Sequence, residues 1–144
     1  MTTGSRSALT GLTLLIALAV LPPPARPQAP AKSSNRAQIE RGRYIVENVA
    51  MCERCHTPRN ENGDPDRARW LMGGPVQTRV TYPVASWPQA EPRLAHSPPG
   101  TDEEFIRLLM TGISRTGYPP RQPMPPFRMT REDAEAVLAY LKSL

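Results

Sequence analysis

The sequence predicts a small all-α domain with about three main helices joined by long proline-rich loops. Helical spacing of apolar residues occurs at 37–50, 101–112 and 130–144, and the last two segments also carry capping signals. The 144-residue chain contains 18 prolines, and only 6% of its residues are aromatic. Proline is excluded from helix interiors and central strands. Because so few large side chains are available for a core, the domain needs a disulfide, a metal or a cofactor for stability.

Residues 1–31 predict an export signal. Arg6 precedes an apolar run of 14 residues, 8–21, which is followed by prolines and then by alanines suited to cleavage after position 25, 29 or 31. The alternative is an uncleaved membrane anchor, although the run is shorter than the roughly 20 residues that span a bilayer. The expected organisation is therefore a signal peptide at 1–31, a flexible linker at 32–37 and a folded domain at 38–144. The expected location is the periplasm, with membrane attachment only if the segment is retained.

The charge of the mature chain argues against a nucleic-acid partner. Residues 32–144 hold 16 Lys and Arg against 13 Asp and Glu, a net charge of +3. These cations form no basic stripe with interleaved aromatic residues, which is the pattern of a nucleic-acid surface.

The first helix is expected in "AQIERGRYIVENVA", where order begins near Gln38 and where Ile39, either Tyr44 or Ile45, and Val49 can share one face. It leads the chain to Cys52. From 57 to 100 no helical or strand period is sustained, and 12 residues are Gly or Pro. A loop of this length in a small domain is functional or wraps around something.

The second helix is expected in "TDEEFIRLLMTG", with Thr101 as N-cap, Glu104 as its reciprocal cap and Gly112 past the end. The next stretch, "ISRTGYPPRQPMPPFRM", contains five prolines and is predicted to be neither helix nor central strand. The last helix, "TREDAEAVLAYLKSL", repeats the capping pattern with Thr130 and Asp133.

Both cysteines of the chain lie in "MCERCH", residues 51–56, and three chemistries can be considered for them. A disulfide would close only a two-residue loop, and the βαβ setting of a redox-active C-x-x-C is missing. A zinc site would need about four ligands, but the chain has only two Cys and two His, and Cys55 adjoins His56. The third chemistry is covalent haem, for which C-x-x-C-H is the attachment signature.

Covalent haem fits the sequence best. Cys52 and Cys55 can add to the two vinyl groups of the porphyrin, and His56 then lies beneath the iron as the proximal ligand. This attachment is made outside the cytoplasm, in agreement with the predicted export signal. A haem also offers a large apolar plate on which helices and loops can pack. The sequence therefore predicts one haem c.

Met124 is the favoured ligand for the other face of the iron. It lies between Pro123 and Pro125, which stiffen the loop and so position a weak thioether ligand before it binds. His96, the other imidazole, and an open distal site remain the alternatives. The expected site residues are thus Cys52, Cys55, His56 and Met124.

Four segments together resemble the class I monohaem cytochromes c, and more narrowly the cytochrome subunits and domains that accept electrons from periplasmic dehydrogenases. The resemblance covers residues 38–144. It rests on "RGRYIVENVAMCERCHTPR", "LMGGP", "TDEEFIRLLMTGI" and "MPPFRMTREDAEAVLAYLKSL". It implies the small cytochrome c fold, in which the first and last helices cross, with Gly42 close to Tyr140.

The resemblance also implies details of the site. Met124 is the distal ligand, and the carbonyl near Gly74-Pro75 accepts a hydrogen bond from the second nitrogen of His56. The loop before the helix at 101–112 departs from the T-P-D and G-I-G-x-W pattern of the dehydrogenase-linked group, so the haem propionate contacts are not assigned. The candidate donors to the propionates, which could equally be packing residues, are Trp70, Tyr82, Trp87 and Tyr118.

The expected function is electron transfer and not enzymatic catalysis, because a six-coordinate His/Met haem has no vacant position for a substrate. The alternative is a haem enzyme or sensor with an open or labile distal site. Expected partners are redox proteins: a donor dehydrogenase, of which the chain could be a subunit, and a terminal oxidase or another cytochrome as acceptor. Arg54, Arg121 and Arg128 are candidates for steering an acidic partner.

Overall fold

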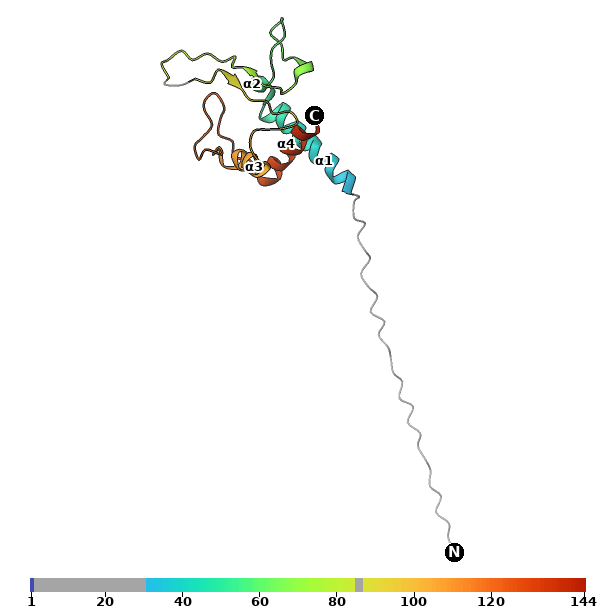
Figure 1. The fold of residues 1–144 in the computed structure, drawn as a ribbon. Helices are drawn as coiled ribbons and strands as arrows, with labels where there is room; N and C mark the ends of the chain where they lie inside the picture. Colours follow the sequence, from blue (N-terminus) through green and yellow to red (C-terminus); the bar gives the residue numbers. More distant parts are fainter. Residues whose placement is uncertain (2–30, 85–86) are drawn as a thin grey trace.

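The computed structural model describes residue 1 and residues 31–84 and 87–144, which form a mostly helical domain (Figure 1). The predicted export segment therefore lies almost wholly outside the described residues. In chain order the elements are α1 (Ala31–Tyr44), a π-helical turn η1 (Ile45–Val49), α2 (Glu53–His56), a 3-10 turn η2 (Arg67–Arg69), β1 (Gly74–Pro75), β2 (Ala90–Glu91), α3 (Asp102–Thr111) and α4 (Arg131–Ser143).

The first helix begins earlier than the sequence predicted. Residues 32–37, expected to be a linker, belong to α1, which starts at Ala31. Pro30 is the last proline before the helix, so no proline ring interrupts the backbone hydrogen bonds after it. The helix continues into η1, a π-helical turn in which backbone hydrogen bonds join residues five positions apart, before the chain reaches the cysteines.

Helices α3 and α4 have the predicted caps. Thr101 and Glu104 form a reciprocal capping box at α3, and Gly112 ends that helix in the left-handed conformation with a φ of 66°. At α4 the Thr130 hydroxyl accepts a hydrogen bond from the backbone N–H of Asp133 at 3.1 Å. Polar N-caps thus fix the starts of both helices, and a glycine fixes the end of α3, as the sequence indicated.

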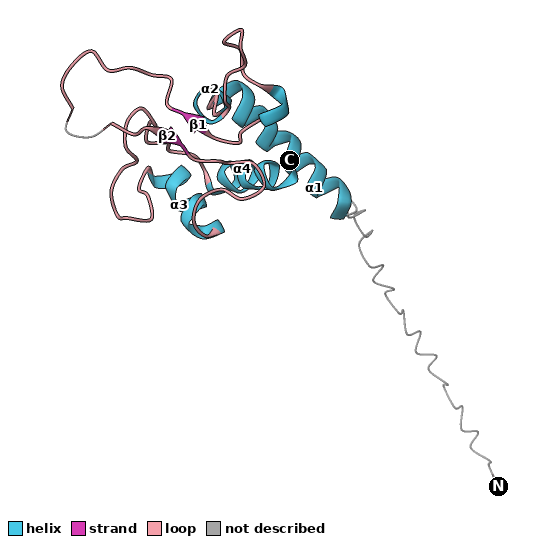
Figure 2. Ribbon diagram, turned by 45° about the horizontal axis from the view of Figure 1, so that its top comes forward, coloured by secondary structure: helices cyan, strands magenta, loops and turns pink. Residues whose placement is uncertain are grey.

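Two strands interrupt the otherwise helical architecture. Strands β1 and β2 pair antiparallel, with Gly74 opposite Glu91 and Pro75 opposite Ala90 (Figure 2). Each strand has only two residues, so the all-α class holds. Their pairing brings together the two ends of the stretch between them and places the segment at 91–95 next to α2, where the site is built.

Helices α1 and α4 cross with their backbones in close contact at Gly42. A Cβ atom at this position would lie 1.9 Å from the backbone oxygen of Ala136 and 2.8 Å from the Cβ of Tyr140. The predicted Gly42–Tyr140 contact is confirmed. An ion pair between Arg41 Nε and Asp133 Oδ1 at 2.9 Å joins the same two helices.

The core lies between these helices, α3 and the 94–95 segment. Its fully buried side chains include Val46, Leu71, Val137 and Leu141. None of the helices in the described ranges is both long enough and apolar enough to cross a membrane.

Tyr140 links three segments through its hydroxyl. The hydroxyl donates to Glu47 Oε1 at 2.7 Å and accepts from the indole N–H of Trp70 at 3.3 Å. Burial, followed by the bond to Glu47, raises the pKa of Tyr140 to about 12 from an ordinary value of 10. The native state therefore holds this proton more tightly than the unfolded chain does.

Replacing Tyr140 by Phe is expected to lower the free energy of unfolding by about 1 kcal/mol at neutral pH, because the hydroxyl bonds are lost. A raised native pKa stabilises the fold fully below pH 10, and this contribution is lost as the pH rises toward 12. The difference between wild type and Tyr140→Phe should therefore shrink over that interval. Guanidinium unfolding from pH 7 to 12 measures it, with Tyr118→Phe, at a side chain 74% exposed, as the control. An equal difference at both ends of the range would refute the linkage.

Candidate functional site

The C-x-x-C-H segment folds as a single helical turn. Cys52 is the N-cap of α2, and the N–H of His56 donates to the carbonyl of Cys52 at 2.9 Å. Before the turn, Met51 has a φ of 50°, and the N–H of Cys52 donates to the carbonyl of Val46 at 3.0 Å. This turn presents both thiols and the imidazole to one cavity.

The cavity is lined by four regions of the chain. The segment at 50–56 supplies one wall, and helices α3 and α4 supply the second. The methionine loop, defined as residues 121–127, supplies the third, and the segment at 91–94 supplies the fourth. The lining is mostly apolar. Its members are Ala50, Met51, Cys52, Cys55, His56, Glu91, Leu94, Phe105, Leu109, Met124, Pro125, Phe127, Val137 and Leu141.

His56 is held in one orientation by its ring and its backbone. The side chain is buried, and Nδ1 lies 2.8 Å from the carbonyl oxygen of Pro92. Because a carbonyl only accepts, Nδ1 carries the proton and donates it. In the neutral ring, Nε2 is then the nitrogen with the free lone pair, and among the described residues no hydrogen bond to it is found. An imidazole with its second nitrogen tied in this way is prepared for a metal.

The carbonyl that orients His56 differs from the expected one. The resemblance placed this acceptor near Gly74-Pro75, whereas the structure shows Pro92. The pairing of β1 with β2 explains the difference, because it occupies Gly74 and Pro75 and aligns the residue after Glu91 with α2. The proline-rich sequence offered no signal that distinguished one carbonyl from the other.

Further backbone contacts brace α2 against the 71–73 and 94–95 segments. The N–H of Gly73 donates to the carbonyl of His56 at 2.7 Å, and the buried Thr57 hydroxyl accepts from the N–H of Leu71 at 3.0 Å. The carbonyl of Leu71 in turn accepts from the N–H groups of Leu94 and Ala95. The loop that lacked any period in the sequence thus supplies the frame around the imidazole.

Cys52 and Cys55 are free thiols, so the structure contains no disulfide between them. Burial, followed by the nearby charge of Glu53, raises the pKa of Cys52 to about 12. Burial is also the main reason why the pKa of Cys55 is raised, with the charge of Glu91 as the second cause. Both sulfurs are neutral at physiological pH and face an apolar space.

Met124 is the predicted distal residue that reaches this cavity. It is half-buried, and its N–H donates to the carbonyl of Arg121 at 3.2 Å. The alternative imidazole, His96, is exposed and lies outside the lining. Met72, another methionine outside the lining, is 40% exposed. Met110 packs against the core from α3. The structure therefore brings all four predicted site residues, 52, 55, 56 and 124, to one cavity.

The candidate donors to the propionates mostly have protein partners. Trp70 donates to Tyr140, and Trp87 donates to the carbonyl of Thr78 at 3.1 Å. Tyr82 donates to Gln122 Oε1 at 3.4 Å, which connects the loop at 76–89 to the methionine loop.

The residues that line the cavity fit a haem. Two thiols on one helical turn suit the vinyl groups of a porphyrin, an oriented imidazole suits the iron, and an apolar lining suits the macrocycle. A small helical domain with such a site defines a haem-binding electron-transfer protein. In agreement, the family model described as Cytochrome c matches residues 39–144, and the chain belongs to this family. The family carries covalently attached haem c, so the predicted cofactor is confirmed.

Three longer redox proteins contain a region similar to this chain. A diheme cytochrome c-type protein of Cereibacter sphaeroides is 61% identical over 45 residues, which are 31% of this chain and 15% of the relative. A subunit of the nicotinate dehydrogenase of Pseudomonas putida is 30% identical over 75% of this chain and 9% of its own length. The fructose dehydrogenase cytochrome subunit of Gluconobacter japonicus is 28% identical over 72% of this chain and 21% of its own length.

The chain thus spans between 9% and 21% of the length of these relatives. Two of the three are named as dehydrogenase subunits. The predicted resemblance to dehydrogenase-associated cytochromes is confirmed.

Proposed function

We propose that this chain is an exported monohaem cytochrome that carries single electrons from a donor dehydrogenase to a downstream acceptor. The observation that carries the proposal is the convergence of Cys52, Cys55, His56 and Met124 on one apolar cavity. When bound there, haem c supplies a one-electron Fe(III)/Fe(II) couple.

Each residue has a defined task in this proposal. The thiols of Cys52 and Cys55 each add their S–H across a vinyl double bond, which forms two thioether links without net oxidation. His56 would bind the iron through Nε2, while Nδ1 keeps its proton and donates it to the carbonyl of Pro92. Met124 would supply the second protein ligand to the iron, from a loop that its flanking prolines stiffen. The apolar side chains exclude water, so electron transfer needs little solvent rearrangement.

The dehydrogenase relatives support a dehydrogenase donor. The pattern of residues 1–31 supports export to the periplasm. Arg54, Arg121 and Arg128 are exposed on α2 and beside the cavity, where they can steer an acidic partner.

Optical spectra test the ligand set. The full chain, made in a host that matures c-type cytochromes, is expected to be low-spin and to show a methionine-to-iron charge-transfer band in the oxidised state. The Met124→Ala variant should lose this band completely, because the other methionine of the lining, Met51, directly precedes Cys52 on the attachment segment and does not lie in the methionine loop. The control is Met72→Ala, which removes an exposed methionine outside the cavity and should keep the band.

Two outcomes contradict the proposal. High-spin iron in the wild type would mean an open distal site and would favour a haem enzyme or sensor. An unchanged band in Met124→Ala would mean that another residue binds the iron.

A further inference from the structure

One acidic side chain lies in the wall of the otherwise uncharged cavity. Glu91, the last residue of β2, lines the cavity together with apolar residues, the two cysteines, His56 and Met124. No other Asp, Glu, Lys or Arg of the described chain is among the lining residues. A carboxylate at this position does not contribute to apolar packing, and the proposed haem ligation does not use it.

The position of Glu91 is fixed by its backbone. Glu91 pairs with Gly74 across the two-stranded sheet, and a Cβ at Gly73 would come within 2.5 Å of the carbonyl oxygen of Glu91. The next residue, Pro92, accepts the hydrogen bond from His56 at 2.8 Å. The same short segment therefore orients the imidazole and places the carboxylate at the wall of its cavity.

Glu91 is a half-buried residue, and its carboxylate is not neutralised by a partner among the described residues. Within 31–84 and 87–144 it makes no hydrogen bond or ion pair, whereas Asp66, Glu103 and Asp133 each pair with an arginine. Its charge also reaches Cys55, where it is the second cause, after burial, of the raised thiol pKa. The negative charge of Glu91 thus lies close to Cys55, one of the two residues proposed to attach the haem.

We propose that Glu91 sets the reduction potential of this cytochrome, its carboxylate favouring the oxidised over the reduced haem. This inference rests on the proposed function. Oxidised haem carries one more positive charge than reduced haem, so a nearby negative charge stabilises the oxidised state more. Because Glu91 is half-buried, salt screens this interaction less than it screens an exposed pair.

Potentiometric titration of the haem-loaded full chain at pH 7, in low and in high salt, tests the inference. The Glu91→Gln variant removes the charge and nearly keeps the shape. It should raise the equilibrium constant for reduction roughly threefold to tenfold, where tenfold corresponds to about 59 mV for one electron. Most of this shift should persist in high salt. Glu91→Asp keeps the charge and should stay near the wild-type potential.

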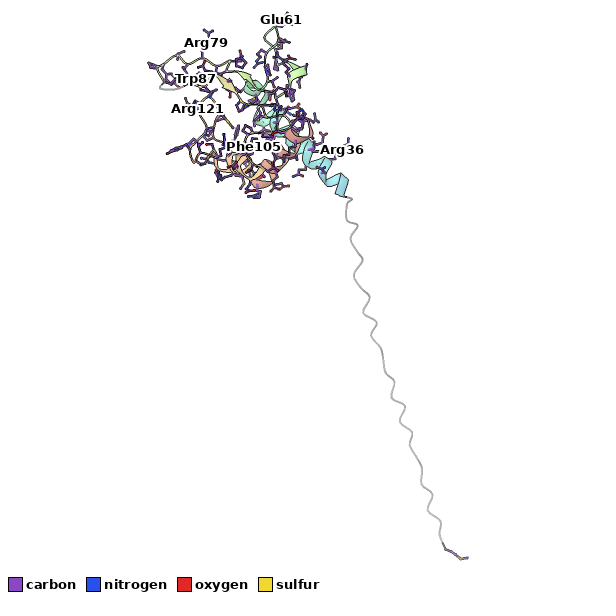
Figure 3. All side chains as sticks on the ribbon, in the orientation of Figure 1. Arg36, Glu61, Arg79, Trp87, Phe105 and Arg121 are labelled. Carbon is purple, nitrogen blue, oxygen red and sulfur yellow. The ribbon has the colours of Figure 1, made fainter. Side chains whose placement is uncertain are left out.

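The matched control is Glu61→Gln. Glu61 is exposed at the tip of the loop between Asn60 and Gly63, outside the cavity (Figure 3). Glu61→Gln changes the net charge of the protein as much as Glu91→Gln does. Because Glu61 is exposed, any shift of the reduction potential that this variant causes should vanish in high salt.

The possible failures are distinguishable. Equal shifts in Glu91→Gln and Glu91→Asp would assign the effect to packing and overturn the role of the charge. The role of the charge would also be overturned if Glu91→Gln had the wild-type potential, or if its shift were no larger than that of Glu61→Gln. The proposed function is tested separately by the methionine-to-iron band of the wild type. If the band is present, a failure of the Glu91 inference leaves the proposed function standing; if it is absent, the proposed function is contradicted.

Discussion

Replacing Gly42 by Ala is expected to destabilise the protein by more than about 3 kcal/mol, because the added methyl group collides with the backbone of α4. Its Cβ would lie 1.9 Å from the carbonyl oxygen and 2.5 Å from the carbonyl carbon of Ala136. Backbone atoms in a helix cannot rotate away as a side chain can, so the two helices must separate. Ala is favoured over Gly in a helix by about 1 kcal/mol, which is too little to offset this collision.

Guanidinium unfolding followed by circular dichroism measures the effect. Gly74→Ala is the matched control, because its Cβ would meet its nearest neighbour, the side chain of Pro58, at an ordinary distance of 3.4 Å. The control should change the stability by less than about 1 kcal/mol. If Gly42→Ala were as stable as wild type, α1 and α4 could not cross at this residue.

Replacing both cysteines is expected to abolish covalent haem attachment. The chain has only two cysteines, and both line the cavity. In the Cys52→Ala/Cys55→Ala variant, acidified organic solvent should extract any haem that remains bound. With no thioether links, His56 and Met124 alone would hold the group, so the yield of loaded protein should also fall steeply.

The single variants Cys52→Ala and Cys55→Ala provide the control for this test. Each should keep one thioether and one unreacted vinyl group, whose conjugation moves the absorption of the reduced pyridine complex to longer wavelength. Haem that resists extraction from the double variant would place its attachment on another side chain. Identical spectra for wild type and a single variant would show that the missing cysteine forms no bond.

Local chemistry made much of the fold and site predictable. The capping pairs at Thr101 and Thr130 fix helix boundaries through hydrogen bonds within one turn, so they can be recognised without knowing the rest of the molecule. The same holds for Cys52, Cys55 and His56, whose spacing alone places them on a single turn of helix. Met124 could be singled out because its neighbouring prolines stiffen the chain locally.

Other features were out of reach because they depend on distant segments. The start of α1 was predicted too late, since residues 32–37 have a composition that suits a linker as well as a helix. Pro92 and Glu91 lie in a stretch without any period. They reach the site only because β1 and β2 pair across a long loop.

The sequence alone determined the helical class, the haem-attachment turn and the stiff methionine loop, because each depends on residues within a few positions of one another. Only the tertiary structure decided which carbonyl orients His56 and which carboxylate lies in the cavity wall. These choices follow from the pairing of 74–75 with 90–91 and from the crossing of α1 with α4. Contacts between segments tens of residues apart leave no periodic trace in the chain, so their outcome becomes visible only when the backbone is folded.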